Sequence, residues 1–391
     1  MKQEYLIAFG GVWYRIYVHQ HDLWVDRKEN GRFHAEKCLL SQVEDSFSAT
    51  ATETYLHCVC KCADGVFYLL FDGTNWHTKK LMEKKDADNT SCHTLLANGK
   101  FVHLLFSCKN NEQNLLVHQL LGYGGSHPTS VDEIGENNFC VSGEDNGDFT
   151  LLYANKEGDL GIRRFRWSEK KFEAFFPLQC GCKLRNAVLY AKDNLLHIAA
   201  YAVFDSFINL LFLSKDITSD DTTLSAVHLL SGEAGPICLD NSSTHPAISW
   251  CESGTILRAQ TTEKGHWSLP QKYVRATGRE NVYCRVIGDT KCYDTFGYFK
   301  NGRMMLYTGE DLPETNITSV DKTPKAFPSK KTAVSTTKES AEPEEIYIRR
   351  SIYTADMAAL RRLIEHQNHL IIELHKKILK MEDKNTSLGS I

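Results

Sequence analysis

The sequence predicts an all-β repeat protein, and two observations in residues 1–312 of its 391 residues carry this prediction. Similar apolar runs recur at a nearly constant spacing. Each is followed by further short runs rich in Val, Leu, Phe and Tyr, which Gly, Asn and Asp interrupt, as in strands and hairpins. Helical periodicity is absent before residue 340.

The recurring run is first clear at YLHCVC (55–60) and returns five times, at FVHLLF (101–106), DFTLLY (148–153), LLHIAAY (195–201), HPAISW (245–250) and CYDTFGY (292–298). When these runs are aligned, their matching residues lie 46, 47, 47, 49 and 47 positions apart, at His57, His103, Thr150, His197, Pro246 and Tyr293. Counting back another 46 residues reaches Gly11, next to VWYRIYV. Seven units of about 47 residues therefore fit before residue 312.

Each unit continues with a second apolar run, a short polar turn and an aromatic residue. These aromatics follow the matching residue of their own unit by 19 to 22 positions, at Phe33, Trp76, Phe172 and Trp267. Three or four short strands in about 45 residues are typical of a propeller blade. We predict a seven-bladed β-propeller over residues 1–312, with six blades as the alternative if the terminal units share one.

The seventh unit is incomplete, because no turn and aromatic follow RMMLYTG (303–309). An unpaired strand edge at the closure of a ring invites association with other chains. We expect EYLIAFG (4–10) to close the ring with N-terminal residues.

Three cysteines, Cys58, Cys60 and Cys62, alternate along one predicted strand. Residues on the same face of a strand lie about 6.5 to 7 Å apart. Tetrahedral zinc, with Zn–S bonds of about 2.3 Å, needs its sulfurs closer together than that. We therefore interpret these thiols as apolar packing groups, and give the C-x-C pair Cys180 and Cys182 little weight as a metal site.

The composition of the chain argues against nucleic-acid binding, membrane insertion and secretion. The net charge is −4 and the pI is about 6.5, so no basic excess points to nucleic acid or to anionic membranes. No apolar run of about 18 residues could span a bilayer, and the N-terminus lacks the apolar core of a signal peptide. Thirteen irregularly spaced cysteines fit reduced thiols. We expect a cytoplasmic protein.

Residues 313–344 carry four prolines among Ser, Thr, Lys and Glu. This composition cannot bury enough apolar surface to offset the entropy of ordering the chain. We predict a flexible linker over residues 313–344.

A heptad pattern then predicts a coiled-coil helix over residues 345–383, with a disordered tail over 384–391. The predicted oligomerisation residues are Met357, Leu360, Ile364, Gln367, Ile371, Leu374, Ile378 and Met381. Ile at a and Leu at d positions favour parallel dimers, but Leu363 and Leu370 at g positions leave trimers and tetramers open. A helix that folds back onto its own propeller is the alternative.

No P-loop, dinucleotide fingerprint, nucleophile elbow or paired C-x-x-C motif is present. His19 and His21 in HQHDLW could form half of a metal site but lack a third ligand. GEDNGDF (143–149) is acidic like a calcium loop, yet it lacks the spacing and distal Glu of an EF-hand. The sequence therefore predicts no catalytic, cofactor-binding or metal residues, no cofactor, and no enzymatic activity.

The polar turns that end in Trp, DGTNW (72–76) and EKGHW (263–267), resemble the hairpins of Asp-box propellers, which include sialidase-like and fucose-lectin-like folds. Leu70 stands where an Asp-box has Ser or Thr. The resemblance implies a propeller over residues 1–312. It also implies sugar sites between blades or a sialidase arginine triad with a Tyr and Glu pair, and this sequence assigns no residues to those roles.

Four other tryptophans do not repeat at one blade position, which argues against several equivalent sugar sites: Trp13, Trp24, Trp167 and Trp250. We predict a non-enzymatic interaction scaffold, in which the propeller presents a binding surface to an unknown protein partner and the C-terminal helix makes a homo-oligomer. The alternative is a carbohydrate-binding, lectin-like or glycosidase-like propeller.

Overall fold

The structure is a computed structural model, and it describes residues 1–307 except 122–126, 145, 179–183, 193, 205–206, 220–221, 241–244, 264, 274–279, 289–291 and 301–302. All of the described residues lie in the first of the two units into which the chain divides, Met1–Val320. The predicted linker, coiled-coil helix, oligomerisation residues and tail all lie outside the described residues. In the described part, no helix has the length and apolar character needed to cross a membrane.

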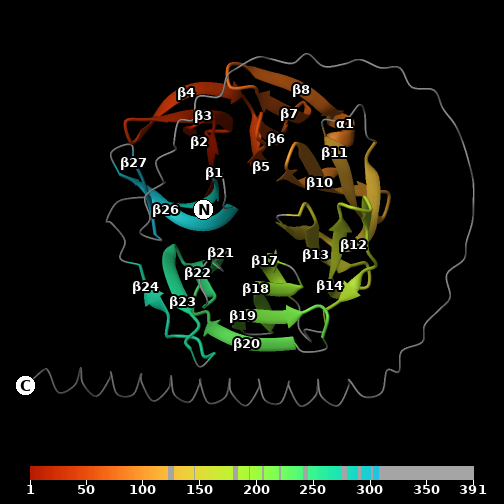
Figure 1. Ribbon diagram of the computed structural model, residues 1–391, viewed down its shortest axis with the longest axis vertical. Helices are drawn as coiled ribbons and strands as arrows, with labels where there is room; N and C mark the ends of the chain where they lie inside the picture. The colour runs from red at the N-terminus through yellow and green to blue at the C-terminus, as the bar shows by residue number, and fades with distance from the viewer. Residues whose placement is uncertain are drawn as a thin grey trace, which may run out of the picture. The chain divides into compact units, whose positions relative to one another are not determined.

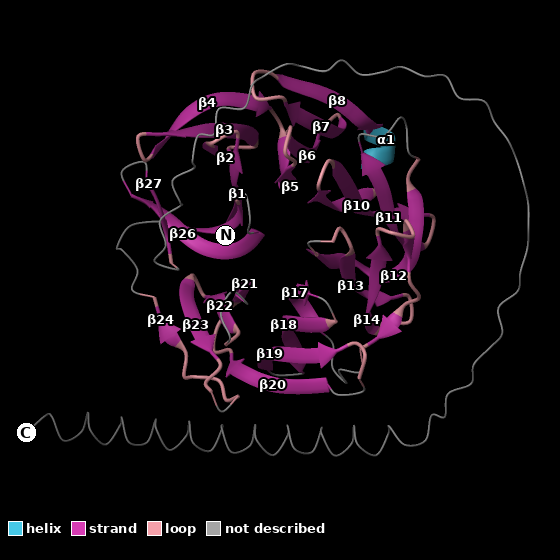
Figure 2. Ribbon diagram, in the orientation of Figure 1, coloured by secondary structure: helices cyan, strands magenta, loops and turns pink. Residues whose placement is uncertain are grey.

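The first unit is built almost entirely from β-strands, which follow one another around a common axis (Figures 1 and 2). Its described strands form five hydrogen-bonded sheets, of seven, eight, four, four and four strands. Dividing the seven-stranded sheet where β1 (Lys2–Phe9) pairs in parallel with β25 (Asn281–Ile287), and the eight-stranded sheet within β12 (Thr129–Gly143), gives seven antiparallel groups, numbered in chain order. Group 1 consists of β1 (Lys2–Phe9), β2 (Val12–His19), β3 (Asp22–Glu29) and β4 (Arg32–Leu40). Group 2 consists of β5 (Val43–Ala51), β6 (Leu56–Cys62), β7 (Gly65–Phe71) and β8 (Trp76–Glu83). Group 3 consists of β9 (Thr90–Asn98), β10 (Phe101–Asn110), β11 (Gln113–Leu121) and the first part of β12 (Thr129–Gly143).

Group 4 begins with the second part of β12, because this strand pairs first with β11 and then with β13. Group 4 continues with β13 (Phe149–Asn155), β14 (Leu160–Arg166), β15 (Lys171–Phe172) and β16 (Phe176–Pro177), and group 5 consists of β17 (Leu184–Lys192), β18 (Leu195–Phe204), β19 (Phe207–Asp216) and β20 (Thr222–Leu229). Group 6 consists of β21 (Ala234–Asp240), β22 (Ala247–Glu252), β23 (Thr255–Gln260) and β24 (Gln271–Lys272). Group 7 consists of β25 (Asn281–Ile287), β26 (Cys292–Lys300) and β27 (Arg303–Leu306).

The repeat read from the sequence corresponds to one position in each group. The aligned runs form the second strands, β2, β6, β10, β13, β18, β22 and β26. The aromatics after the polar turns lie at the fourth-strand position: Phe33 on β4, Trp76 on β8, Phe172 on β15, and Trp267 in a bridge to Thr261. The predicted all-β propeller architecture is thus confirmed.

Asp72 stabilises the turn formed by DGTNW (72–76). The Asp72 carboxylate accepts hydrogen bonds from the backbone N–H groups of Thr74 and Asn75, both at 2.7 Å, and so fixes the turn between β7 and β8. A further hydrogen bond from His77, together with these two, lowers the pKa of Asp72 to about 2. Trp76 then stacks on Phe71 with ring centroids 5.0 Å apart.

Each group shares a hydrophobic core with the next, because most of its strands are apolar on both faces. A core joins every successive pair from groups 1 and 2 to groups 6 and 7. One more core joins group 7 back to group 1, where Leu6, Trp13 and Phe33 pack against Val286 and Met304.

The N-terminal strand makes this last junction continuous. Strand β1 pairs in parallel with β25, from Lys2 opposite Val282 to Ile7 opposite Ile287. The N-terminal segment EYLIAFG therefore joins the two ends of the repeat, as predicted, although it does so beside the innermost strand of group 7. Group 7 itself has three described strands, and β27 lies at its outer edge.

The three alternating cysteines serve as core residues. Cys58, Cys60 and Cys62 all belong to the core between groups 1 and 2, whereas Val59 between them faces the core with group 3. Burial raises the pKa of Cys60 to about 12 and raises that of Cys58 as well, so both stay protonated. Protonated, inaccessible thiols behave as small apolar groups.

One short helix departs from the expectation that helices are absent before residue 340. Helix α1 (Lys84–Ala87) is a single turn between β8 and β9, visible in Figure 2. It buries only Ala87. A four-residue turn is too short to leave a helical period in the sequence.

The junction between group 7 and group 1 gives the first prediction. Leu6 is fully buried in the core that contains Trp13 and Val286, so the substitution Leu6→Ala should lower the free energy of unfolding by about 2–5 kcal/mol. Urea unfolding followed by tryptophan fluorescence measures it. Leu195→Ala, at a residue that is 41% exposed, is the control and should change stability by under about 1 kcal/mol. Equal losses in both variants would contradict a stabilising role for the β1 junction.

Candidate functional site

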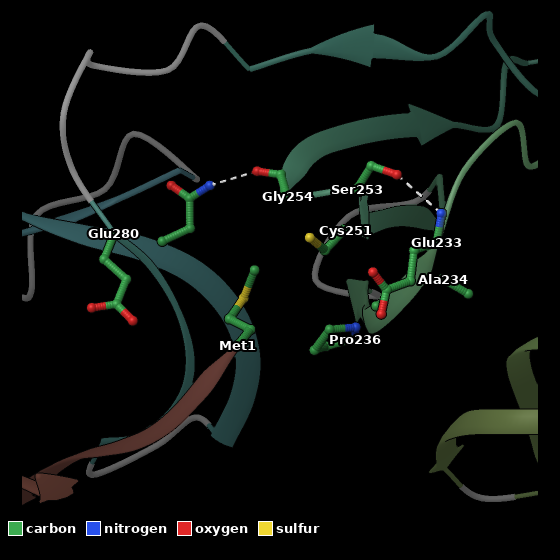
Figure 3. A pocket seen from close by; sticks show the side chains of 10 residues that line it. Met1, Glu233, Ala234, Pro236, Cys251, Ser253, Gly254 and Glu280 are labelled. Carbon is green, nitrogen blue, oxygen red and sulfur yellow. Dashed lines mark hydrogen bonds between the residues drawn. The ribbon is translucent and has the colours of Figure 1, made fainter. Parts of the chain in front are cut away.

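A cavity lies between groups 6 and 7, at the end where β1, β21 and β25 begin. Its volume is about 260 Å³. Figure 3 shows its lining residues, which are Met1, Glu233, Ala234, Gly235, Pro236, Cys251, Ser253, Gly254, Glu280 and Asn281. Among the described residues, the core between groups 6 and 7 has four buried hydrophobic residues, compared with fifteen between groups 1 and 2, so the described part of this junction is sparsely filled.

Local sequence explains the hollow. The pairing of β21 with β22 is irregular between Ala234 and Ile237, so the Gly235–Pro236 pair bulges out of the ladder. A Cβ atom on Gly235 would lie 2.8 Å from the Cβ of Cys251, so only glycine fits there. Small residues on both strands leave space that a larger side chain would fill.

Hydrogen bonds hold the walls of the cavity in place. Glu233 donates its backbone N–H to Ser253 Oγ at 3.0 Å, and its carbonyl accepts from the Ser253 N–H at 2.9 Å. On the other wall, Asn281 Nδ2 donates to the Gly254 carbonyl at 3.2 Å, while Tyr307 donates to Asn281 Oδ1 at 2.8 Å. The cavity is therefore preformed.

Two carboxylates flank the cavity on opposite sides, Glu233 and Glu280 (Figure 3). Within the described residues, the Glu233 carboxylate makes no hydrogen bond or ion pair. Glu280 contacts Lys2 at 3.3 Å, and both side chains are more than half exposed. Such an exposed pair contributes at most about 1 kcal/mol.

An ion pair lies near the axis of the ring. Arg285 on β25 donates from Nε and Nη2 to the two carboxylate oxygens of Asp294 on β26, both at 2.8 Å. Burial raises the pKa values of Tyr5, Cys140 and Cys238, on strands of groups 1, 4 and 6, and the positive charge of Arg285 partly opposes each rise. Groups from around the ring thus converge on this pair.

A second ionic network lies at the junction of groups 1 and 7. Arg15 pairs with Glu4 at 2.6 Å and with Asp26 at 3.0 Å, and its guanidinium lies between the rings of Tyr17 and Phe299. Burial opposes the charge of Arg15, yet its hydrogen bond and attraction to Glu4 outweigh burial and raise its pKa. The network fixes β2 against β26 and leaves no free acid or base among these three charged groups.

One cluster contains the residue types of a catalytic triad but in the wrong order. Glu252 accepts from the Ser231 hydroxyl at 2.8 Å and contacts His228 Nε2 at 3.1 Å. In a triad the histidine lies between the serine and the acid, so that it can take the serine proton. Here the carboxylate lies between them, so His228 cannot activate Ser231.

Two histidines form a buried pair between groups 3 and 4. His103 Nδ1 lies 2.9 Å from His118 Nε2, and both rings pack against Phe149 and Phe165. Burial lowers the pKa of His103 to about 3 and that of His118 to about 4. Both imidazoles are therefore neutral at pH 7.

The other sequence motifs are accounted for structurally. His19 and His21 are exposed at the turn between β2 and β3, and the described residues contain no cluster of three potential metal ligands. In GEDNGDF, Glu144 pairs with Arg164 and Asp148 with Arg166, so these acids hold the turn between β12 and β13. Cys180 and Cys182 lie outside the described residues.

The cavity itself was not predicted from the sequence. Its glutamates, Glu233 and Glu280, belong to no motif and are 47 residues apart. The one available signal was the local pattern GEAGP (232–236), where Gly and Pro interrupt an innermost strand.

Comparisons with known proteins bear on the fold. No protein-family model and no curated protein matches the sequence. A polysaccharide lyase of family PL25, an ulvan lyase solved with bound -[GlcA(1-4)Rha3S]-, is similar with a TM-score of 0.54 and 11% identity, over 77% of this chain and 90% of that chain. The chain is a β-propeller.

Two further solved structures align with lower TM-scores. The fucose lectin of Aleuria aurantia, described as six-bladed, aligns with a TM-score of 0.43 and 10% identity over 70% of this chain and 96% of the lectin. AofleA from Arthrobotrys oligospora aligns with a TM-score of 0.43 and 11% identity over 67% of this chain and 84% of that chain. At such identities, likeness extends to the fold alone.

The ion pair at the ring axis gives a second prediction. Asp294→Ala leaves the partly buried Arg285 without its counter-charge and removes both of its hydrogen bonds, so it should cost about 2 kcal/mol of unfolding free energy. Glu83→Ala removes an exposed pair with Lys80 and should cost under about 1 kcal/mol. Urea titration measures both, and similar values for the two variants would show that the axial pair is not a stabilising contact.

The histidine pair predicts acid sensitivity. An unfolded histidine titrates near pH 6.5, whereas the folded pair titrates at about 3 and 4, so the unfolded chain binds more protons between these values. The stability that the neutral pair contributes is complete above pH 6.5 and is lost as the pH falls toward 4.

A double substitution isolates this contribution from those of His57 and His93, whose pKa values burial also lowers to about 4. Between pH 7 and 4.5, His103→Leu/His118→Leu should lose less stability than the wild type, by on the order of 3 kcal/mol. Equal losses in urea titrations at the two pH values would mean that the pair does not cause the acid sensitivity.

Proposed function

We propose that this protein is a non-enzymatic interaction scaffold, in which a propeller presents a binding surface to a protein partner and a C-terminal coiled coil joins several copies. The observation that carries the proposal is the pairing of reactive groups inside the ring. Arg285 is bound to Asp294, Arg15 to Glu4 and Asp26, and Glu252 separates Ser231 from His228. Such mutually bound groups stabilise a fold and are not poised as acid, base or nucleophile for a substrate.

The seven strand groups support a seven-bladed propeller as the finer description. Seven hydrophobic cores join successive groups, and one of them returns from group 7 to group 1. Strands β25–β27 share one hydrogen-bonded sheet with group 1 through the pairing of β1 with β25, a connection that a six-bladed ring with shared terminal units would also have. The contact of Phe33 on β4 with Phe299 on β26 brings the outer parts of the two groups face to face, and this supports two separate blades.

Oligomerisation rests on the heptad stripe from Met357 to Met381. Two or more propellers on one coiled coil would raise the effective concentration of weak binding surfaces, with residues 313–344 as the tether. The cytoplasm is the proposed compartment, because buried free thiols such as Cys58 and Cys60 suit a reducing environment.

Carbohydrate binding is the second candidate. The ulvan lyase, which has the same fold, is described with a bound sugar, and one fold can carry many different binding sites. Thermal stabilisation of the full-length protein by an oligosaccharide, at millimolar concentration and without any protein partner, would favour this candidate over the scaffold.

The coiled coil gives a test of the main proposal. Ile371→Asp places a charge in the predicted seam and should convert the full-length protein from an oligomer to a monomer at tens of micromolar. His369→Asp, on the outer face of the same helix, should leave the oligomer intact. Multi-angle light scattering reads the mass directly. A wild-type monomer under these conditions would remove the oligomeric part of the proposal.

A further inference from the structure

We propose that the cavity between groups 6 and 7 binds a lysine or arginine side chain of a partner protein. This inference rests on the proposed scaffold function and names the chemistry of its partner. Shape, lining and charge each support it.

The size of the cavity suits a single side chain. Its volume of about 260 Å³ is below the range of about 300–1,000 Å³ that is typical of small-molecule sites. Its walls are held by the Glu233–Ser253 and Asn281–Gly254 hydrogen bonds, so a ligand meets a preformed site. Preformed walls reduce the ordering cost of binding.

The lining combines apolar walls with acidic ends. Ala234, Pro236, Cys251 and the Met1 side chain supply apolar surface. Long cationic side chains place their methylene groups along such surface and keep the charged end near water or a carboxylate. A lysine or arginine side chain matches this arrangement.

The two glutamates differ from most other acids described above in how little they interact. Asp294, Glu4 and Glu252 each have close partners within the fold. Glu233 has none within the described residues, and the exposed Lys2–Glu280 contact is weak enough for an incoming cation to replace. These carboxylates are therefore available to a ligand.

The same features disfavour a sugar at this position. Protein sites that hold sugar rings commonly offer an aromatic face, and the cavity lining contains no Trp, Tyr or Phe among the described residues. An acidic polysaccharide would in addition be repelled by the Glu233 carboxylate, which has no cationic partner among the described residues. Cationic peptide is the ligand class that the lining favours.

The test uses the full-length protein and two fluorescein-labelled peptides, (Lys-Ser)₄ and (Glu-Ser)₄, with fluorescence anisotropy at low salt as the readout. The wild type should bind the basic peptide and not the acidic one. Glu233→Gln and Glu280→Gln should each weaken binding about threefold, and the double variant about tenfold. Glu112→Gln, which removes one charge at the exposed turn between β10 and β11, is the matched control and should have no effect.

Charge reversal provides a gain of function that misfolding cannot imitate. Glu233→Lys/Glu280→Lys should lose the basic peptide and acquire the acidic one. Equal binding of the basic peptide by the Glu112→Gln and Glu233→Gln/Glu280→Gln proteins, a preference of the wild type for the acidic peptide, or displacement of the basic peptide by a neutral oligosaccharide would overturn the inference. Each of these results leaves the oligomer measured by light scattering unaffected, so the scaffold proposal is tested separately.

Discussion

The parallel pairing of β1 with β25 is the contact on which the rest of this propeller depends. A strand group that is apolar on both faces cannot be stable alone, because each face must be covered by a neighbour. In a linear array the first and last groups would each expose one face. Strand β1 brings these two faces together, and Leu6, Trp13 and Val286 form the core that covers them.

A closed ring of this kind explains the use of polar residue types in the core. Cys58, Cys60, His103 and His118 occupy buried strand positions, where each lies between two neighbouring groups. Burial keeps the thiols protonated and the imidazoles neutral, and the two histidines share one hydrogen bond. Residues that often act in catalysis are here part of the packing.

The charged residues of the interior follow the same logic. A buried charge is tolerated only with a partner, and Arg15, Arg164 and Arg285 each have a carboxylate within hydrogen-bonding distance. The cavity between groups 6 and 7 is different, because small residues replace large ones and two glutamates have weak partners or none in the described part of the chain. A ligand bound in this cavity would fill the space that the side chains of groups 6 and 7 leave open.

The sequence by itself determined the repeat, because strands packed on both faces require the same apolar runs at the same spacing in every unit. It also determined the role of the alternating cysteines, since strand geometry keeps their sulfurs apart. Only the tertiary structure decided how the N-terminal strand is paired at the closure of the ring and where a cavity forms. Both depend on residues distant in the chain, such as Leu6 beside Val286 and Gly235 against Cys251, and local periodicity carries no information about such contacts.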